Sequence, residues 1–90
     1  MFVVSTPREP NNLGQARLGL IIAKRFAPHA VTRNTIKRVI REGFRVRQHQ
    51  LPARDYVFRL QSRVPALSLR ELKKLARAEV EVHLERLSRP

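Results

Sequence analysis

Apolar residues recur with two different periods along the 90 residues of the chain. Short runs with the character of strands cover residues 2–6, 17–24 and 55–60. Residues 30–49 and 69–87 instead repeat their apolar positions every three or four residues, as helices with one buried face do. The pattern predicts the order strand, strand, helix, strand, helix in a single domain, residues 1–90. Its predicted fold class is α+β, with helices and a small sheet packed as a two-layer α/β sandwich.

Both predicted helices carry an apolar stripe that a sheet can cover. In the first helix the stripe consists of Ile36, Val39, Ile40 and Gly43. In the last helix it consists of Leu69, Leu72, Ala76, Val80 and Leu87. Ser68 and Glu71 have the spacing of a capping box, in which the serine hydroxyl accepts from the Glu71 amide and the Glu71 side chain returns to the Ser68 amide. We therefore expect the last helix to begin after Ser68.

Positive charge dominates the surface of the first predicted helix. The whole chain has 19 Lys and Arg against 7 Asp and Glu, a formal charge of +12. Arg33, Lys37, Arg41 and Arg45 follow one another at i, i+4 spacing. Like charges at this spacing repel by a few tenths of a kcal/mol per pair, so the row favours a polyanionic partner. A solvated surface without a partner is the alternative interpretation.

No constellation of an enzyme site is present in the sequence. The serines lack a convincing His and acid set, and the three histidines are too scattered for a metal site. His83 falls on the apolar stripe of the last helix, which indicates a packed or helix-terminal residue. The chain has no cysteine, no apolar run of bilayer length and no signal peptide, so we expect no membrane partner. We predict neither catalytic residues nor metal ligands in the protein itself.

The segment from Arg17 to Arg45 resembles the protein subunit of bacterial ribonuclease P. That family has the pattern R-x-G-x-x-x-S-K-K, a short loop, and A-V-x-R-N-R-I-K-R-x-x-R-E-x-F-R. Here residues 17–25 read RLGLIIAKR and residues 30–45 read AVTRNTIKRVIREGFR. Residues 55–58, DYVF, resemble the next strand of the family. The resemblance extends over residues 2–87.

The resemblance implies a fold and a function that the residues alone do not indicate. The implied fold is ribosomal protein S5 domain 2-like, with the basic helix in a left-handed βαβ crossover. The implied function is to assist a catalytic RNA, the partner subunit, in the endonucleolytic hydrolysis that removes the 5′ leader of precursor tRNA. The RNA subunit would carry the chemistry and hold most of the Mg2+, and the protein alone would be inactive. Such a protein is expected in the cytoplasm.

The resemblance also implies two sets of site residues. Contacts with the catalytic RNA are expected from Lys24, Arg25, Arg33, Asn34, Lys37, Arg38, Arg41 and Arg45. A cleft for the leader is expected on one face of the sheet, at Val3, Ser5, Ile21, Ala23, Val57 and Arg59.

The chain departs from the family pattern at four places. Thr35 replaces the second arginine of R-N-R, and Pro28-His29 replaces a glycine-asparagine pair and so removes a good N-cap. Ser5 stands where the cleft has an aromatic residue, and we expect the family's N-terminal helix to be absent.

Three other functions are known for small basic chains, and the sequence argues against two of them. A structural RNA-binding protein of the ribosomal type would share its size and charge. A DNA-binding module would need a helix-turn-helix or a dimer seam, and neither is present, so DNA is not an expected partner. A membrane-surface helix is disfavoured because the stripe of Ile36, Val39 and Ile40 is short and lacks bulky interfacial aromatic residues.

Overall fold

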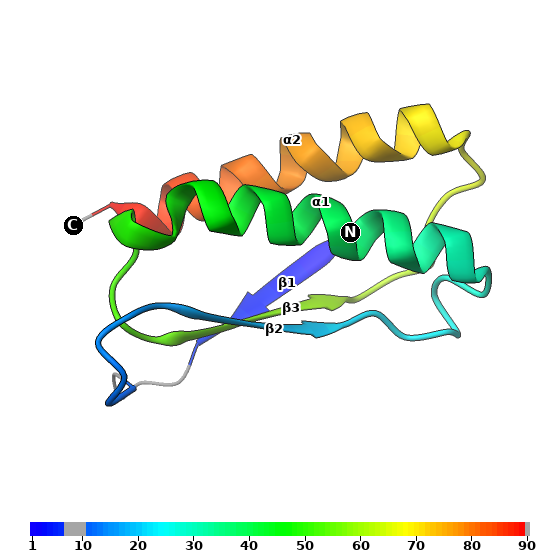
Figure 1. Ribbon diagram of the computed structural model, residues 1–90. Coiled ribbons are helices and arrows are strands. Elements are labelled where there is room, and N and C mark those ends of the chain that lie inside the picture. The colour runs from blue at the N-terminus through cyan, green and yellow to red at the C-terminus, as the bar shows by residue number, and fades with distance from the viewer. Residues whose placement is uncertain (7–10, 90) are drawn as a thin grey trace.

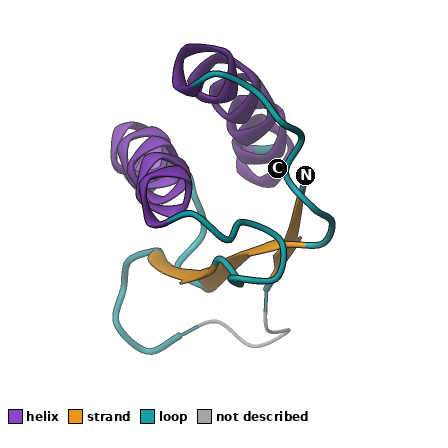
Figure 2. Cartoon of the chain, turned by 90° about the vertical axis from the view of Figure 1, so that its right-hand side faces the viewer, coloured by secondary structure: helices purple, strands orange, loops and turns teal. Residues whose placement is uncertain are grey.

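Two helices lie over one face of a three-stranded sheet (Figures 1 and 2). The computed structural model describes residues 1–6 and 11–89. Its elements are β1 (Phe2–Ser5), β2 (Arg17–Ile21), α1 (Ala30–Arg47), the 3-10 turn η1 (Gln48–Gln50), β3 (Asp55–Leu60) and α2 (Leu69–Ser88). The predicted succession of elements and the two-layer α+β class are confirmed.

The strand order is β1-β3-β2, so the last strand in sequence is central. β1 runs antiparallel to β3 with Val4 opposite Phe58, whereas β2 runs parallel to β3 with Leu20 opposite the same residue. α1 connects the two parallel strands across the covered face of the sheet. The views in Figures 1 and 2 show that this connection is left-handed, against the usual right-handed rule. The handedness implied by the family resemblance is therefore confirmed.

Three predicted boundaries were wrong by one to three residues. The second strand ends at Ile21 rather than at residue 24, because the carbonyl of Ala23 accepts from the amides of Phe26 and Ala27, both at 3.1 Å, and turns the chain. The first strand ends at Ser5 rather than Thr6. The first helix ends at Arg47, and its last predicted residues form the 3-10 turn before Pro52.

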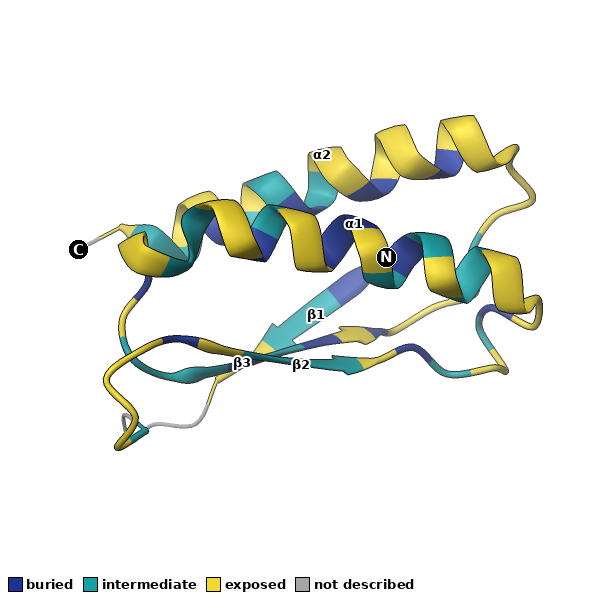
Figure 3. Cartoon of the chain, viewed as in Figure 1, coloured by how far each residue is buried: buried dark blue, intermediate teal, exposed yellow. Residues whose placement is uncertain are grey.

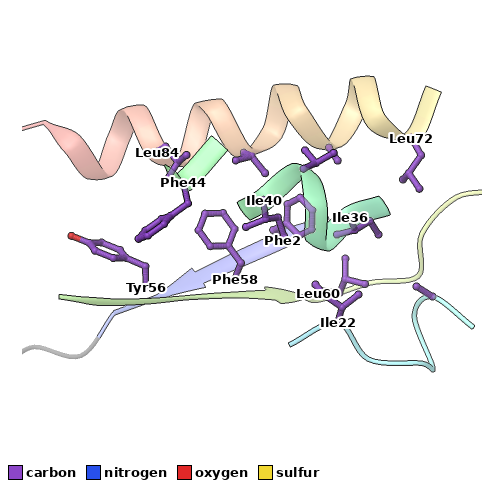
Figure 4. Close-up of a cluster of buried hydrophobic side chains, with 14 of the residues drawn as sticks. Phe2, Ile22, Ile36, Ile40, Phe44, Tyr56, Phe58, Leu60, Leu72 and Leu84 are labelled. Atoms are coloured by element: carbon purple, nitrogen blue, oxygen red, sulfur yellow. The ribbon is translucent and has the colours of Figure 1, made fainter. Parts of the chain in front are cut away.

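The core lies between the sheet and both helices. Ile36 and Ile40 of α1 are fully buried against Phe58 and its neighbours, and Val39 is buried beside them (Figures 3 and 4). Phe44 completes the buried face of α1, although the predicted stripe had Gly43 at that end. Gly43 instead permits close packing of the helices, since a Cβ atom there would lie 2.9 Å from a methyl group of Val80.

The start of α2 is built around Ser68. Its hydroxyl accepts from the Glu71 amide at 3.1 Å, as predicted. The return bond differs from the predicted one. The Ser68 hydroxyl donates to the Glu71 carboxylate at 2.9 Å, whereas the prediction had the Ser68 amide as the donor. The buried face of α2 consists of Leu72, Ala76, Val80 and Leu84. Leu69 and Leu87, which the predicted stripe included, are only partly covered.

Glu79 ties α2 to the edge of the sheet. Its carboxylate accepts from the amide of Phe2 at 2.6 Å, so Glu79 is more than an ordinary surface charge. His83 lies one turn further along, with its ring 6.1 Å from that of Phe58 in an edge-on arrangement. Burial lowers the pKa of His83, and the Glu79 carboxylate opposes this shift only in part. His83 is therefore a packed residue, as its place on the apolar stripe predicted.

The buried face of α1 predicts opposite outcomes for two substitutions in neighbouring turns. Ile40→Asp places an unpaired carboxylate in the core and is expected to destabilise the fold by at least about 3 kcal/mol. Lys37→Ala removes a side chain from the flank of the same helix and leaves the domain folded. Thermal melts followed by circular dichroism distinguish the two. Equal melting temperatures would contradict the face assignment.

The lowered pKa of His83 predicts a loss of stability in mild acid. A folded state that binds the proton less readily than the unfolded chain loses stability as the pH falls below the ordinary histidine value of 6.5 and towards the folded pKa. Between about pH 7.5 and 5.5, the melting temperature should therefore fall more steeply for the wild-type chain than for His83→Gln. Parallel curves for the two proteins would show that His83 does not control this dependence.

Candidate nucleic-acid interface

The outward face of α1 is a nearly continuous cationic surface. The helix carries six Lys and Arg residues and a single carboxylate, Glu42. Arg38, Arg41 and Arg45 are exposed, and so is Asn34 beside them. Because the apolar side of the helix is held in the core, these side chains face solvent together. We call this set, with Lys37 and Arg33 on its flank, the α1 basic surface.

Two members of the α1 basic surface are less available for contact with a partner than the sequence suggests. Lys37 is only partly exposed. Arg33 directs its guanidinium back to the loop before the helix, where it donates to the carbonyl oxygens of Ala27 and Pro28, both at 2.9 Å. Arg33 therefore stabilises the start of α1 in addition to contributing charge.

The N-terminus of α1 has no local negative charge. His29 occupies the N-cap position without a side-chain hydrogen bond, and the first turn contains no acidic residue. The predicted loss of a good cap at Pro28-His29 is confirmed. The hydroxyl of Thr35, in the second turn, is already engaged, because it donates to the Val31 carbonyl oxygen at 2.7 Å. Unsatisfied amides at a helix N-terminus favour an anion, so this end adds to the positive field of the surface.

Lys24 and Arg25 lie in the loop between β2 and α1, although the predicted strand included Lys24. Both are exposed, and the Arg25 guanidinium lies 4.6 Å from the centre of the Phe26 ring. Stacking of this kind restricts the arginine at small energetic cost and leaves its donors available. The loop thus extends the cationic surface beyond the helix.

The second face of the sheet is not covered by a helix in the part of the chain that the structure describes (Figure 2). The register places Val3 opposite Arg59 and Ser5 opposite Val57, while Ile21 lies beside Arg59 from the other strand. Five of the six residues predicted for the leader cleft therefore share this face. Ala23 does not, because β2 has already ended and the chain turns at that residue.

Gly19 is a feature of the open face that the sequence prediction missed. It pairs with Val57, and together with Arg17 and Asp55 these residues line a hollow of about 170 Å³. A Cβ atom at position 19 would lie 3.4 Å from one Val57 methyl group and 4.0 Å from the other, and would fill part of this space. Strict alternation from Ile21 places Gly19 on the same face, so the signal was present in the sequence.

An ion pair between Arg17 and Asp55 lies at one end of the open face. Arg17 donates to Asp55 at 3.0 and 3.3 Å, and the Asn11 amide donates to the same carboxylate at 3.1 Å. These hydrogen bonds, that from Arg17 first, lower the pKa of Asp55. The pair neutralises Arg17, which leaves Arg59 as the charged side chain in the middle of this face.

The described residues contain no candidate metal centre and no candidate membrane span. Within residues 1–6 and 11–89, no group of three or more His, Cys, Asp or Glu side chains is placed to hold a metal ion. Within the same ranges, no helix has both the length and the apolar character needed to cross a bilayer. The surfaces that the fold does present are one cationic helix layer and one open sheet face.

Comparison with known proteins matches nearly the whole chain to one family. The family model described as Ribonuclease P matches residues 2–88. A ribonuclease P protein component of Bordetella parapertussis is 57% identical over 91 residues, covering 98% of this chain and 74% of that protein. The corresponding protein of Bordetella avium is 53% identical over 89 residues, covering 99% and 74%.

Solved structures agree with the sequence relatives. The RNase P protein of Thermotoga maritima superimposes with a TM-score of 0.70 at 28% identity, covering 99% of this chain and 78% of that one. The RNase P protein of Staphylococcus aureus gives a TM-score of 0.68 at 28% identity, covering 98% and 77%. The sheet with two helices on one face is therefore shared with these proteins.

The α1 basic surface predicts how nucleic-acid binding depends on salt. If about five phosphates are contacted, the slope of log K against log salt should lie between roughly −3.5 and −4.5, which brackets single-stranded and duplex nucleic acid. Titrations at several salt concentrations, read by fluorescence anisotropy, measure this slope. A slope near zero would contradict an electrostatic interface.

Proposed function

This chain belongs to the ribonuclease P protein family, and we propose that its two surfaces divide the work of a ribonuclease P subunit between them. Members of the family are the protein component of a ribonucleoprotein endoribonuclease that acts in tRNA processing. The chain accordingly has an RNA partner, the RNA subunit of ribonuclease P. Family membership also decides against a structural protein of the ribosomal type, the alternative that the composition left open.

The helix layer is the surface we assign to the RNA subunit. The single observation that carries this assignment is the one-sided charge of α1, with Arg38, Arg41 and Arg45 exposed together and only Glu42 opposing them. A folded RNA presents phosphates along its surface, and arginine and lysine bind them without reading sequence. In this proposal Lys24 and Arg25 extend the contact from the loop before α1.

The open face of the sheet is the surface we assign to the 5′ leader of precursor tRNA. Val3, Ile21 and Val57 offer apolar area there, and Arg59 lies among them as a cation. Such a face suits single-stranded RNA, because aliphatic side chains contact ribose and bases while the cation contacts the backbone. The hollow at Gly19 gives the backbone of the leader room to approach the strands.

We propose that the Mg2+ ions for hydrolysis stay mainly on the RNA subunit. The described residues that face the interface are mostly cationic and do not fit a divalent metal ion on their own. Phosphoester hydrolysis commonly uses metal ions that stabilise charge on the attacking and leaving oxygens. The protein would neutralise phosphates nearby and hold the leader, and it would be inactive without RNA. We expect this activity in the cytoplasm, where a chain without cysteine is unaffected by reducing conditions.

The proposal predicts that the protein matters most when magnesium is scarce. Phosphate neutralisation by the protein and by Mg2+ overlap, so stimulation of the ribozyme should be largest at low magnesium and shrink as magnesium rises. Cleavage of a precursor tRNA by a bacterial ribonuclease P RNA, measured with and without the chain over a magnesium series, tests this. Leader cleavage by the protein alone, or equal stimulation at every magnesium concentration, would contradict the proposal.

Variants on the α1 basic surface test, in the same assay, whether this surface is responsible for the effect. Lys37→Ala combined with Arg41→Ala should raise the magnesium concentration needed for half-maximal cleavage, while circular dichroism shows a folded protein. Arg33 is left intact because it also holds the loop before α1. Lys74→Ala combined with Arg86→Ala, two exposed substitutions on α2, serves as the control matched for the loss of two charges. An identical magnesium requirement for both proteins would remove α1 from the interface.

A further inference from the structure

A groove between the two helices continues the α1 basic surface onto α2. α1 and α2 run side by side with their N-terminal ends at the same end of the molecule (Figure 1). Near those ends, a groove of about 470 Å³ is lined by Val31, Asn34, Thr35 and Arg38 of α1 and by Leu69 and Lys73 of α2. These positions point away from the sheet, since the buried sides of both helices face it. The groove is thus separate from the open sheet face.

The groove contains cations and no carboxylate among the described residues that line it. Arg38 and Lys73 face it from opposite helices, and both are exposed without an ion pair to a described acid. Further along the two helices the neighbouring hollow has both signs of charge, with Glu42, Arg77 and Glu81 in its lining. Uncompensated positive charge is therefore confined to the N-terminal part of the groove.

Cations gather in the N-terminal half of α2. Its first half carries Arg70, Lys73, Lys74 and Arg77 against Glu71, whereas its second half carries Glu79, Glu81 and Glu85 against Arg86. Glu71 is engaged with Ser68, so it is not directed at the other cations. Like charges three or four residues apart on a helix repel by a few tenths of a kcal/mol per pair. An anionic ligand at this end of α2 would reduce that repulsion.

The remaining lining of the groove suits a nucleotide rather than a bare anion. Val31 is 55% exposed and Leu69 is 42% exposed, so aliphatic surface lies next to the two cations. The exposed Asn34 amide has both a donor and an acceptor, which can bond to a base edge. RNA-binding proteins commonly combine three contacts: cations bind the phosphate, aliphatic carbon packs on the ribose, and an amide hydrogen-bonds to the base edge.

We propose that this groove binds one phosphate of the RNA subunit and the nucleotide attached to it, with Lys73 as the contact from α2. The inference rests on the proposed function, because it extends the surface assigned to that RNA. It adds Lys73 to the interface, a residue outside the segment in which the family pattern is densest.

The test compares two adjacent lysines of α2. Lys73→Ala removes the cation of the groove, and Lys74→Ala removes an exposed cation that does not line it. The probe is a bacterial ribonuclease P RNA without precursor tRNA, so the leader cannot contribute. Loss of one phosphate contact should weaken binding about fourfold to sixfold near 0.15 M salt and reduce the salt slope by about 0.7–0.9. Lys74→Ala should change neither by as much.

A charge-restoring variant separates the contact from a folding effect. Thr35 lines the same groove from α1, so Thr35→Arg in the Lys73→Ala background should recover most of the affinity and the slope. Thr35→Gln in that background, which adds a polar side chain without charge, should not. Equal effects of the two lysine variants, or rescue by glutamine as well as arginine, would overturn the inference. Failure of the wild-type chain to bind the RNA would instead refute the proposed function itself.

Discussion

Burial of one side of α1 against the sheet is the constraint on which both surfaces depend. Ile36 and Ile40 have no solvent exposure, and Phe58 beneath them has none either. Once these side chains are fixed in the core, the helix cannot rotate, and the cations at the intervening positions must face solvent together. Their mutual repulsion is a small cost compared with the apolar burial that holds them there. A charged surface with a fixed orientation therefore follows from the packing of uncharged residues.

The same packing leaves the opposite face of the sheet open. Both helices cover the side that carries Phe2, Tyr56 and Phe58, and the left-handed crossover of α1 keeps that helix on the same side as α2. Strand residues that point to the other side of the sheet, such as Val3 and Arg59, have no helix over them in the described part of the chain. A chain of this size thus presents two separate faces, one of helices and one of strands, and the proposed function assigns a different RNA to each.

Sequence periodicity was sufficient for the elements and for most of their faces, because each depends on local alternation between apolar and polar residues. It failed where a tertiary contact decides the outcome. Ala23 was placed on a strand face, but backbone hydrogen bonds to its carbonyl turn the chain there. Periodicity also gave no indication that Glu79 links α2 to β1 by accepting from the amide of Phe2. The crossover hand came from the family resemblance, since no residue pattern encodes it. Lys73 was missed because only the side-by-side packing of the helices brings it near Arg38.

The central claim is that the helix layer faces the RNA subunit while the open sheet face holds the leader. Because the chain has no cysteine, single cysteines can carry a tethered hydroxyl-radical source at Glu42→Cys on α1 or at Ser5→Cys on β1. In the complex with catalytic RNA and precursor tRNA, the probe on α1 should cleave the RNA subunit, and the probe on β1 should cleave the leader. Cleavage of the leader from position 42 and of the RNA subunit from position 5 would contradict the account.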